Sequence, residues 1–256
     1  MAKIIAFANQ KGGVAKTTTA VNLSAYLAMA GKKILLVDTD PQGNATSGVG
    51  IDRRALKHCI YDVIINNLAA ETVVVKSSFA NLAVLPATIA LAGAEIELVS
   101  AISRENKLKK ALKPLRNSYD YIFIDCPPSL GLLTVNALTA ADSIIIPLQC
   151  EYYALEGVSQ LMNTYSLVKK HLNADLKIEG VLLTMYDSRT NLSEQVAEEA
   201  KNYFSKQVYN SVIPRSVRLS EAPSHGLPAL YYDAKSKGSE AYSLLADEFL
   251  TRNNDR

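Results

Sequence analysis

Two lysines and three threonines lie around a pair of glycines near the start of the chain, in a pattern that suits the binding of phosphate groups. The stretch from Gln10 to Thr19 reads QKGGVAKTTT. Adjacent glycines let the backbone come close to phosphate oxygens, and the free amide groups of a following helix attract their negative charge. Lys16 can contact the β and γ phosphates of a nucleotide, and the hydroxyl of Thr17 can bind Mg²⁺. We therefore predict a nucleoside triphosphate site, whose loop residues are Lys11, Gly12, Gly13, Val14, Ala15, Lys16, Thr17 and Thr18.

The residues on either side of this loop indicate a strand and a helix. Ile4–Ala8 is a short apolar run of the kind that forms a buried strand, and Ala20–Ala28 carries apolar residues at helical spacing. A strand, a glycine-rich turn and a helix in this order form the setting that a phosphate-binding loop requires. The local pattern thus supports the chemistry that the loop suggests.

Carboxylates follow a second apolar run. Lys33–Val37 leads into Asp38 and Asp40, and Pro41 and Gly43 then interrupt regular structure. A carboxylate near a γ-phosphate can orient or deprotonate the attacking water. The segment therefore offers its carboxylates to the nucleotide, while a polar turn capped by Asp38 is the alternative interpretation.

A third apolar run, Tyr121–Asp125, ends in an aspartate and continues into two prolines. An aspartate at the end of a buried strand beside a phosphate-binding loop can hold Mg²⁺, directly or through water. The pattern is weak alone and becomes informative together with the glycine-rich loop. The predicted ligands of Mg²⁺ are Thr17, Asp40 and Asp125.

Short apolar runs alternate with helical stretches along the whole chain, which predicts an α/β fold. Continuous apolar runs are typical of parallel strands that are covered on both faces, so we expect a doubly wound, mostly parallel sheet with helices on both faces. The predicted strands are Ile4–Ala8, Lys33–Val37, Leu82–Leu85, Tyr121–Asp125, Ser143–Pro147, Ile178–Thr184 and Val208–Ile213. The predicted helices include Leu56–Asn67, a basic amphipathic segment Ser103–Arg116, and Ser239–Thr251. No linker interrupts the pattern, so we expect a single domain over residues 1–256.

Composition sets limits on the class of protein. The 256 residues carry a formal net charge of only +2, so any nucleic-acid binding must come from a local patch. The three cysteines are far apart, which favours a reduced, cytoplasmic protein over a disulfide framework or a zinc site. No apolar run reaches the ~20 residues of a membrane span, and the first residues lack the pattern of a secretory signal.

Several of these segments resemble one family in register and in order. The loop has a second lysine, Lys11, ahead of its glycines, and this form resembles the deviant Walker A box of the ParA/MinD family of P-loop ATPases. The segments Asp38–Asn44 and Asp125–Leu130 are similar to the two switch regions of that family. Ile213–Gly226 resembles the ParA segment that borders the adenine. The resemblance covers nearly the whole chain and is closest to ParA/Soj-type partition ATPases.

The resemblance implies a mechanism and partners. ATP and Mg²⁺ are the expected cofactors, hydrolysis is expected to depend on Asp40, and Lys11 is expected to cross a homodimer interface and contact the partner subunit's nucleotide. The ATP-bound dimer is expected to bind double-stranded DNA without sequence preference through Arg189, Arg215 and Arg218. A ParB-type centromere-binding protein is the expected partner, and the expected location is cytoplasmic and nucleoid-associated. Surface salt bridging is the alternative role for these arginines, and Ser103–Arg116 is the other candidate DNA surface.

The resemblance also indicates the base-binding residues and some departures. A polar residue at the position of Asp187 reads the adenine edge in many P-loop relatives, and backbone groups around Pro214 can read the base. Pro147–Gly157 resembles a segment near the family's dimer interface, with Tyr152 and Tyr153 either there or in the core. Ala15 stands where a third glycine is frequent, and a positive φ there would cost of order 1 kcal/mol and weaken nucleotide binding.

Two other functions stay open on the same nucleotide-binding cassette. One is a MinD-like, membrane-associated spatial regulator, but the short polar tail after Phe249 does not resemble a membrane helix. The other is a metabolic phosphoryl-transfer enzyme similar to dethiobiotin synthetase, which needs a second small-molecule pocket. The first strand begins at Lys3, so we expect no N-terminal helix-turn-helix extension.

Overall fold

Seven strands form one sheet in the computed structural model, which describes residues 1–151 and 154–254 and leaves Tyr152 and Tyr153 outside the described residues. The sheet order is β3-β4-β2-β5-β1-β6-β7, and every pairing is parallel except that of β3 with β4. The strands are β1 (Lys3–Phe7), β2 (Ile34–Asp38), β3 (Val75–Lys76), β4 (Leu82–Leu85), β5 (Tyr121–Asp125), β6 (Ser143–Gln149) and β7 (Lys177–Thr184). The predicted doubly wound, mostly parallel sheet is confirmed.

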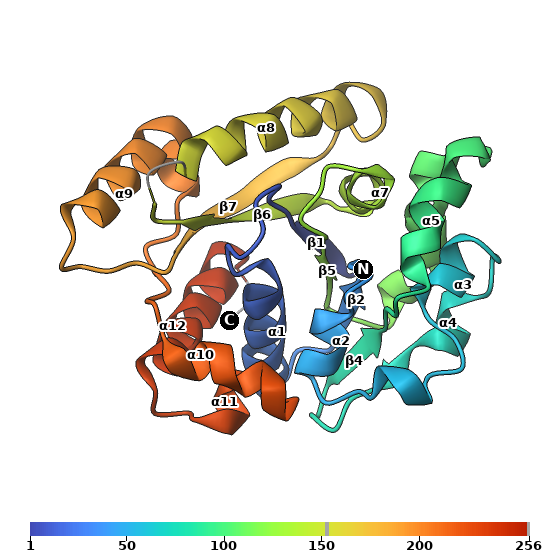
Figure 1. Cartoon of the computed structure of the whole chain (residues 1–256), viewed down its shortest axis with the longest axis horizontal. Helices are drawn as coiled ribbons and strands as arrows, with labels where there is room; N and C mark the ends of the chain where they lie inside the picture. The colour runs from blue at the N-terminus through green and yellow to red at the C-terminus, as the bar shows by residue number, and fades with distance from the viewer. Residues whose placement is uncertain (152–153, 255–256) are drawn as a thin grey trace.

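Helices cover both faces of this sheet (Figure 1). One face carries α3 (Ile60–Ile64), α4 (Ala70–Val73), α5 (Leu91–Glu97), α6 (Lys107–Leu112), α7 (Leu132–Ala140), α8 (Ala154–His171) and α9 (Asn191–Phe204). The other carries α1 (Lys16–Met29), α2 (Asn44–Gly48), α10 (Val217–Glu221), α11 (Ala229–Tyr232) and α12 (Lys237–Arg252). Helices α1 and α12 lie side by side on this second face.

The two faces explain why the central strands are apolar throughout. In β1, Ile5 and Phe7 belong to the core under α1 and α12, whereas Ile4 and Ala6 belong to the opposite core. Successive side chains of a strand point to opposite faces, so a strand buried on both sides needs apolar residues at every position. This is the physical basis on which the central strands could be predicted.

The predicted strand Val208–Ile213 is wrong. This segment runs along the outer edge of β7, but it makes only scattered backbone bonds to that strand, such as Tyr209 N–H to the carbonyl of Val181. The amides of Asn210 and Ser211 donate instead to the two carboxylate oxygens of Glu248, each at 2.8 Å. A carboxylate on α12 therefore takes the donors that a continuous ladder would use.

Two predicted helices are shorter than expected, and one strand was missed. Leu56–Asn67 is helical only over Ile60–Ile64, because the amide of Cys59 bonds to the Asp62 carboxylate and starts the helix there. The basic segment Ser103–Arg116 is split into α6 and flanking single turns, the last of which starts at Pro114. The missed strand is β3, which has only two residues, too few to show the alternation of apolar and polar side chains that indicates a strand.

The turn that enters α1 has a left-handed backbone at two residues. Gly13 has φ 76°, and Ala15, directly before Lys16, has φ 68° and ψ 30°. Glycine adopts this region freely, whereas an L-residue with a Cβ is strained there by about 1–2 kcal/mol. Ala15 thus has the positive φ whose cost the sequence analysis considered.

We predict that Ala15→Gly raises the free energy of unfolding by about 0.5–1 kcal/mol, because the removed strain exceeds the added entropy of the unfolded chain. Urea unfolding of the nucleotide-free protein measures this. Ala20→Gly, inside α1, is the matched control and should destabilise the protein by about 1 kcal/mol or more. Equal losses in both variants would contradict the assignment of strain to Ala15.

Candidate nucleotide-binding site

Hydrogen bonds tie the glycine-rich loop to residues in or next to three strands. Asn9, just after β1, accepts from the amide of Lys11 (3.0 Å) and donates to the carbonyl of Pro147 in β6 (2.8 Å). The hydroxyl of Thr184, at the end of β7, donates to the carbonyl of Val14 (3.1 Å). These contacts fix the loop backbone before any ligand binds. Sequence reasoning missed Asn9 and Thr184, because their partners are backbone groups far along the chain.

Lys16 lies inside this loop. Its side chain is buried, and its ammonium group donates to the carbonyl of Lys11 (2.8 Å). Burial lowers the pKa of Lys16 below its ordinary value, while the charges of Asp125 and Asp40 oppose that shift. The structure therefore brings the Lys16 ammonium group close to the carboxylates of Asp125 and Asp40.

Two of the carboxylates lie on neighbouring strands. Asp38 and Asp125 are register partners at the carboxyl ends of β2 and β5, and both are fully buried. Asp38 accepts from the amide (2.8 Å) and hydroxyl (2.7 Å) of Thr46 and from the amide of Asp40 (3.1 Å). Burial still raises the pKa of Asp38 to about 6, and burial together with the charge of Asp38 raises that of Asp125 well above its usual range.

Asp125 and Thr17 form a pair suited to a cation. The hydroxyl of Thr17 lies 2.7 Å from Asp125 Oδ2, and Asp125 Oδ1 is buried without a hydrogen-bond partner among the described residues. A buried carboxylate oxygen without a partner is costly unless a donor or a cation reaches it. The donor set thus fits Mg²⁺, which prefers oxygen ligands.

Asp40 lies at the edge of the same cluster. Its carboxylate accepts from the amide of Gln42 (2.8 Å), and its carbonyl accepts from Gly43 (2.8 Å), so the loop after β2 closes on itself. The hydroxyl of Thr39 donates to the carbonyl of Asp125 (2.7 Å) and ties this loop to β5. Asp40, Asp125 and Lys16 are therefore brought together from three separate segments.

Lys11 points away from the cluster. It is half-exposed, and its ammonium group forms an ion pair with Glu151, two residues after the end of β6. The sequence did not indicate Glu151 as a partner. Lys11 is thus on the rim of the loop, while Lys16 is inside it.

A hollow of about 380 Å³ adjoins the loop on the side of the C-terminal segment. Ala15 and Thr18 form one wall, and Pro214 lies on the other. Most of the further lining residues belong to the segment Ile213–Gly226, which the resemblance placed beside the adenine; Arg215 among them was predicted to bind DNA, and only Met185 was not singled out. They are Met185, Ile213, Arg215, Ser216, Leu219, Ser220 and Pro223. Asp187 does not line it, because both its carboxylate oxygens bond to the Arg189 guanidinium, at 2.9 and 2.7 Å.

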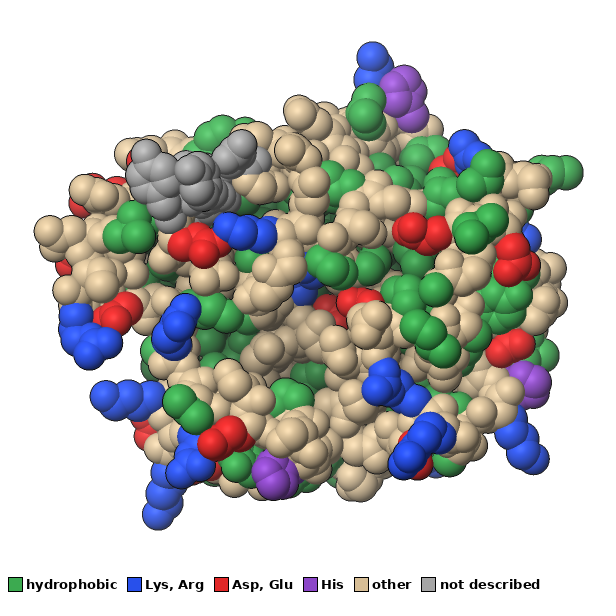
Figure 2. All heavy atoms as spheres, in the orientation of Figure 1, with side chains coloured by type: hydrophobic (Ala, Val, Ile, Leu, Met, Phe, Trp, Pro, Cys, Tyr) green, Lys and Arg blue, Asp and Glu red, His purple; other side chains and the backbone are tan. Residues whose placement is uncertain are grey.

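The three predicted arginines are exposed and lie on neighbouring segments. A bridge between Tyr186 and Pro214 joins the loop after β7 to the segment of Arg215. Hydrogen bonds from Arg189, aided by the charge of Arg215, lower the pKa of Asp187 to about 2. Arg218, on α10, pairs with Glu221 (2.9 Å) and Asp233 (3.3 Å). Figure 2 shows Lys and Arg side chains gathered at the lower left of this face, where Figure 1 has α10 and α11.

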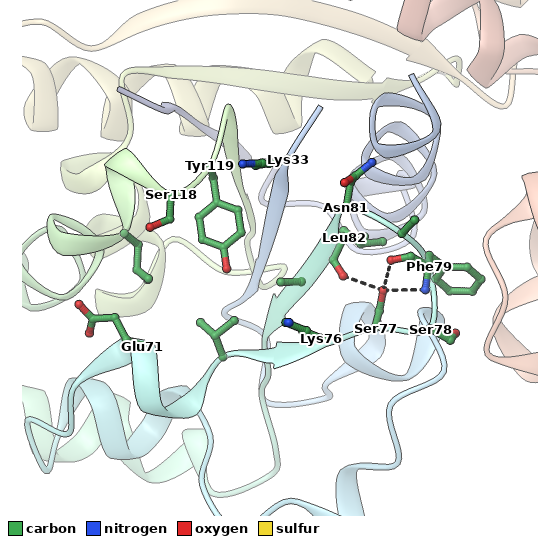
Figure 3. Close-up of a pocket in the computed structure, with 14 residues that line it drawn as sticks. Lys33, Glu71, Lys76, Ser77, Ser78, Phe79, Asn81, Leu82, Ser118 and Tyr119 are labelled. Atoms are coloured by element: carbon green, nitrogen blue, oxygen red, sulfur yellow. Dashed lines mark hydrogen bonds between the residues drawn. The ribbon is translucent and has the colours of Figure 1, made fainter. Parts of the chain in front are cut away.

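A larger cavity, of about 800 Å³, is elsewhere. It is a groove at the amino ends of β2, β4 and β5, whereas Asp38 and Asp125 lie at the carboxyl ends of β2 and β5. Figure 3 shows Lys33, Lys76 and Tyr119 around it, with the Ser77 hydroxyl donating to the carbonyl of Leu82, the first residue of β4. None of the predicted nucleotide-binding residues lines it.

Comparison with known proteins agrees with this geometry. Residues 2–178 match a family described as an AAA domain. The chain is 63% identical to the sporulation initiation inhibitor protein Soj of Bacillus subtilis, over 97% of this chain and 98% of Soj. It is 57% identical to the chromosome partitioning protein ParA of Myxococcus xanthus, over 98% of this chain and 88% of ParA.

A solved structure is similar in fold and sequence. It is a Mycobacterium smegmatis protein described as cobyrinic acid a,c-diamide synthase, with bound ADP and magnesium. The match has a TM-score of 0.87 and 41% identity, and it covers 99% of this chain and 96% of that one. Together with the loop that carries Lys11 and Lys16, the full-length identity to Soj and ParA identifies the family: the chain belongs to the ParA/Soj family of chromosome-partitioning ATPases.

Proposed function

We propose that this chain hydrolyses ATP to switch a homodimer between DNA-bound and free states, and that residues 1–256 act as one domain. The observation that carries the proposal is the cluster of Lys16, Asp40 and Asp125 beside Thr17, with a separate lysine, Lys11, on the rim. The first set suits a triphosphate and its metal ion within one subunit. The rim lysine suits a contact outside the subunit.

Each side chain of the cluster has a distinct task. Lys16 contacts the β and γ phosphates, and the backbone of Gly12–Thr18 surrounds them. Thr17, Asp40 and Asp125 hold Mg²⁺, which neutralises phosphate charge when bound. Among the described residues, no group of three or more His, Cys, Asp or Glu forms a metal cage. Mg²⁺ usually keeps water and phosphate oxygens among its ligands, so these three side chains would suffice to hold it. Asp40 also orients the attacking water.

The base is assigned to the 380 Å³ hollow, between Thr18 and the segment of Pro214. Met185, in the loop after β7, lines the hollow. It has a left-handed backbone (φ 51°), a conformation that often marks a functional position. Asp187 can read the adenine edge only after its carboxylate leaves Arg189. The base is thus recognised mainly by shape and backbone groups.

DNA binding follows from the arginines and from dimerisation. Guanidinium groups bind phosphate oxygens in pairs, and phosphate contacts carry no base information. One subunit offers Arg189, Arg215 and Arg218, and a two-fold dimer doubles the contacts on one face, so affinity rises much more than twofold. A ParB-type partner stimulates hydrolysis and returns the protein to monomers. This chain acts in the cytoplasm, on the nucleoid.

Among the described residues, no helix has both the length and the apolar character of a membrane span. The structure gives little support to the alternative of a metabolic phosphoryl-transfer enzyme. An ATP-dependent synthase needs its second substrate next to the transferred phosphate. The 800 Å³ groove that could hold such a substrate is at the opposite edge of the sheet from Asp125.

Asp40→Ala is predicted to keep ATP affinity within about threefold while lowering hydrolysis by about 100-fold or more, because it removes the group that orients water. Calorimetry measures binding, and phosphate release measures turnover. Lys16→Ala should lose binding itself. Glu71→Ala, which removes an exposed carboxylate in the distant groove, is the control and should change neither. Wild-type turnover by Asp40→Ala would remove Asp40 from the mechanism.

Lys11→Ala is predicted to leave the ATP-bound protein monomeric, because the rim lysine is the group assigned to the partner's nucleotide. Light scattering with ATP, in the Asp40→Ala background to prevent hydrolysis, measures the mass. Lys76→Ala removes an exposed lysine at the far edge of the sheet and should dimerise normally. A dimer of normal stability in Lys11→Ala would contradict the role across the interface.

Arg189→Glu and Arg218→Glu are each predicted to weaken DNA binding by about tenfold or more while retaining ATP and the dimer. Gel shifts with unrelated duplexes, with ATP, with ADP and without nucleotide, measure this. Affinity should fall steeply with salt, with a slope of about −0.9 per phosphate contact on logarithmic axes.

Lys109→Glu is the matched control, because it reverses a charge on α6, which packs on the other face of the sheet. It should bind DNA normally. Full binding by both arginine variants together with a loss in Lys109→Glu would move the DNA surface to residues 103–116. Equal binding in all three nucleotide states would refute the switch.

A further inference from the structure

A row of polar side chains joins the helix after the phosphate-binding loop to the C-terminal part of the chain. Thr19, Asn22 and Tyr26 are three and four residues apart, so they share one face of α1. Thr19 Oγ1 lies 3.0 Å from the hydroxyl of Tyr242, and the Tyr26 hydroxyl lies 2.8 Å from Ser239 Oγ. Asn22, between them, contacts a different element.

The side-chain amide of Asn22 uses both of its ends. Its Nδ2 donates to the carbonyl of Thr18 (2.8 Å), and its Oδ1 accepts from the backbone N–H of Ala229 (2.7 Å). Ala229 is the first residue of α11, so its N–H has no partner within the helix. A backbone N–H only donates and a carbonyl only accepts, so only one orientation of the amide satisfies both. Asn22 is 4% exposed, so water does not replace it easily.

These two contacts join the opposite walls of the base-side hollow. Thr18 is on one wall, and Pro214 and Pro223 are on the other, in the segment that runs on to Ala229. A second hollow of about 390 Å³, lined by Thr18, Asn22 and Pro223 among others, lies between the same two elements. The contact between Asn22 and Ala229 therefore helps to position the part of this wall near Pro223, while the bridge to Tyr186 holds the part at Pro214.

A close backbone contact limits the same segment from the other side. A Cβ atom on Gly226 would lie 2.9 Å from the Cα of Gly50, and both glycines have a positive φ, 65° and 80°. Gly50 follows α2, the helix that begins after the Asp40 loop. The segment from Pro214 to Ala229 is thus held between α1 and α2, and Asn22 is its direct link to the phosphate-binding loop.

We propose that Asn22 is a positioning residue for the nucleotide: through Ala229 it sets the base-side wall and so contributes to affinity for the base and not for the phosphates. This inference rests on the base position proposed above. If Asn22 had only a general structural role, the result would differ, because loosening of the fold lowers the affinity for every ligand of the site alike.

The test compares ATP with inorganic tripolyphosphate, which has the phosphates without the base. Asn22→Leu keeps the approximate shape and leaves the Ala229 N–H without its acceptor, a loss of the size that changes affinity by about tenfold. Calorimetry with Mg²⁺ should show ATP binding weakened about tenfold and tripolyphosphate binding within twofold of the wild type. Asn22→Ala, a smaller change, should show the same selectivity to a lesser degree if Asn22→Leu folds poorly.

Tyr26→Phe is the matched control. It removes a buried hydrogen bond from the same face of α1, to Ser239, at a distance from the hollow. Its unfolding midpoint should fall, while its affinities for both ligands stay at the wild-type values. A similar loss of both ligands in the Asn22 variants, or no loss of ATP affinity, would overturn the proposal.

Met185→Ala shows whether the proposed base position fails as well. Met185 lines the hollow directly, so its truncation should weaken ATP and leave tripolyphosphate unchanged. If Met185→Ala is selective and the Asn22 variants are not, only the role of Asn22 is refuted. If neither is selective, both the role of Asn22 and the base position are refuted.

Discussion

The site depends on two carboxylates that the sheet brings together and removes from water. Asp38 and Asp125 are register partners on β2 and β5, and both are fully buried. Desolvation and mutual repulsion disfavour two ionised groups in this position, so the surrounding loops supply compensating donors. Thr46 donates twice to Asp38, and Thr17 donates to Asp125. The hydrogen bonds from Thr46 and Thr17 thus offset part of the cost of burying the two carboxylates.

The compensation is incomplete, and this incompleteness gives the site its function. Asp125 Oδ1 keeps no hydrogen-bond partner among the described residues, and the buried Lys16 ammonium bonds to a backbone carbonyl. We propose that a divalent cation and a triphosphate supply the charges that the protein alone lacks. The buried charges of the nucleotide-free protein are thus incompletely compensated, and a bound cation and triphosphate would lower this electrostatic cost. Binding of the ligand and stability of this edge are therefore expected to be coupled.

The sequence was informative where one segment contains both the signal and its cause. The apolar runs of β1, β4 and β5 could be predicted because each strand is buried on both faces, and the residues Lys11–Thr18 carry their own glycines and lysines. It was uninformative where the cause lies elsewhere in the chain. The sequence of Val208–Ile213 predicts a strand, but the carboxylate of Glu248 accepts hydrogen bonds from the amides of Asn210 and Ser211. Asn9, Thr184 and Asn22 act on remote backbone groups, which no local pattern reveals.

The way in which the sheet ends has a consequence for self-association. On one side the last strand, β3, is two residues long and exposes Lys76. On the other, the irregular segment 208–213 runs along β7, and the amides of Asn210 and Ser211 bond to Glu248. A short, charged or covered edge is a poor template for a further strand. Copies of this chain that gather on DNA, as proposed above, are therefore not expected to join into fibres through their edge strands.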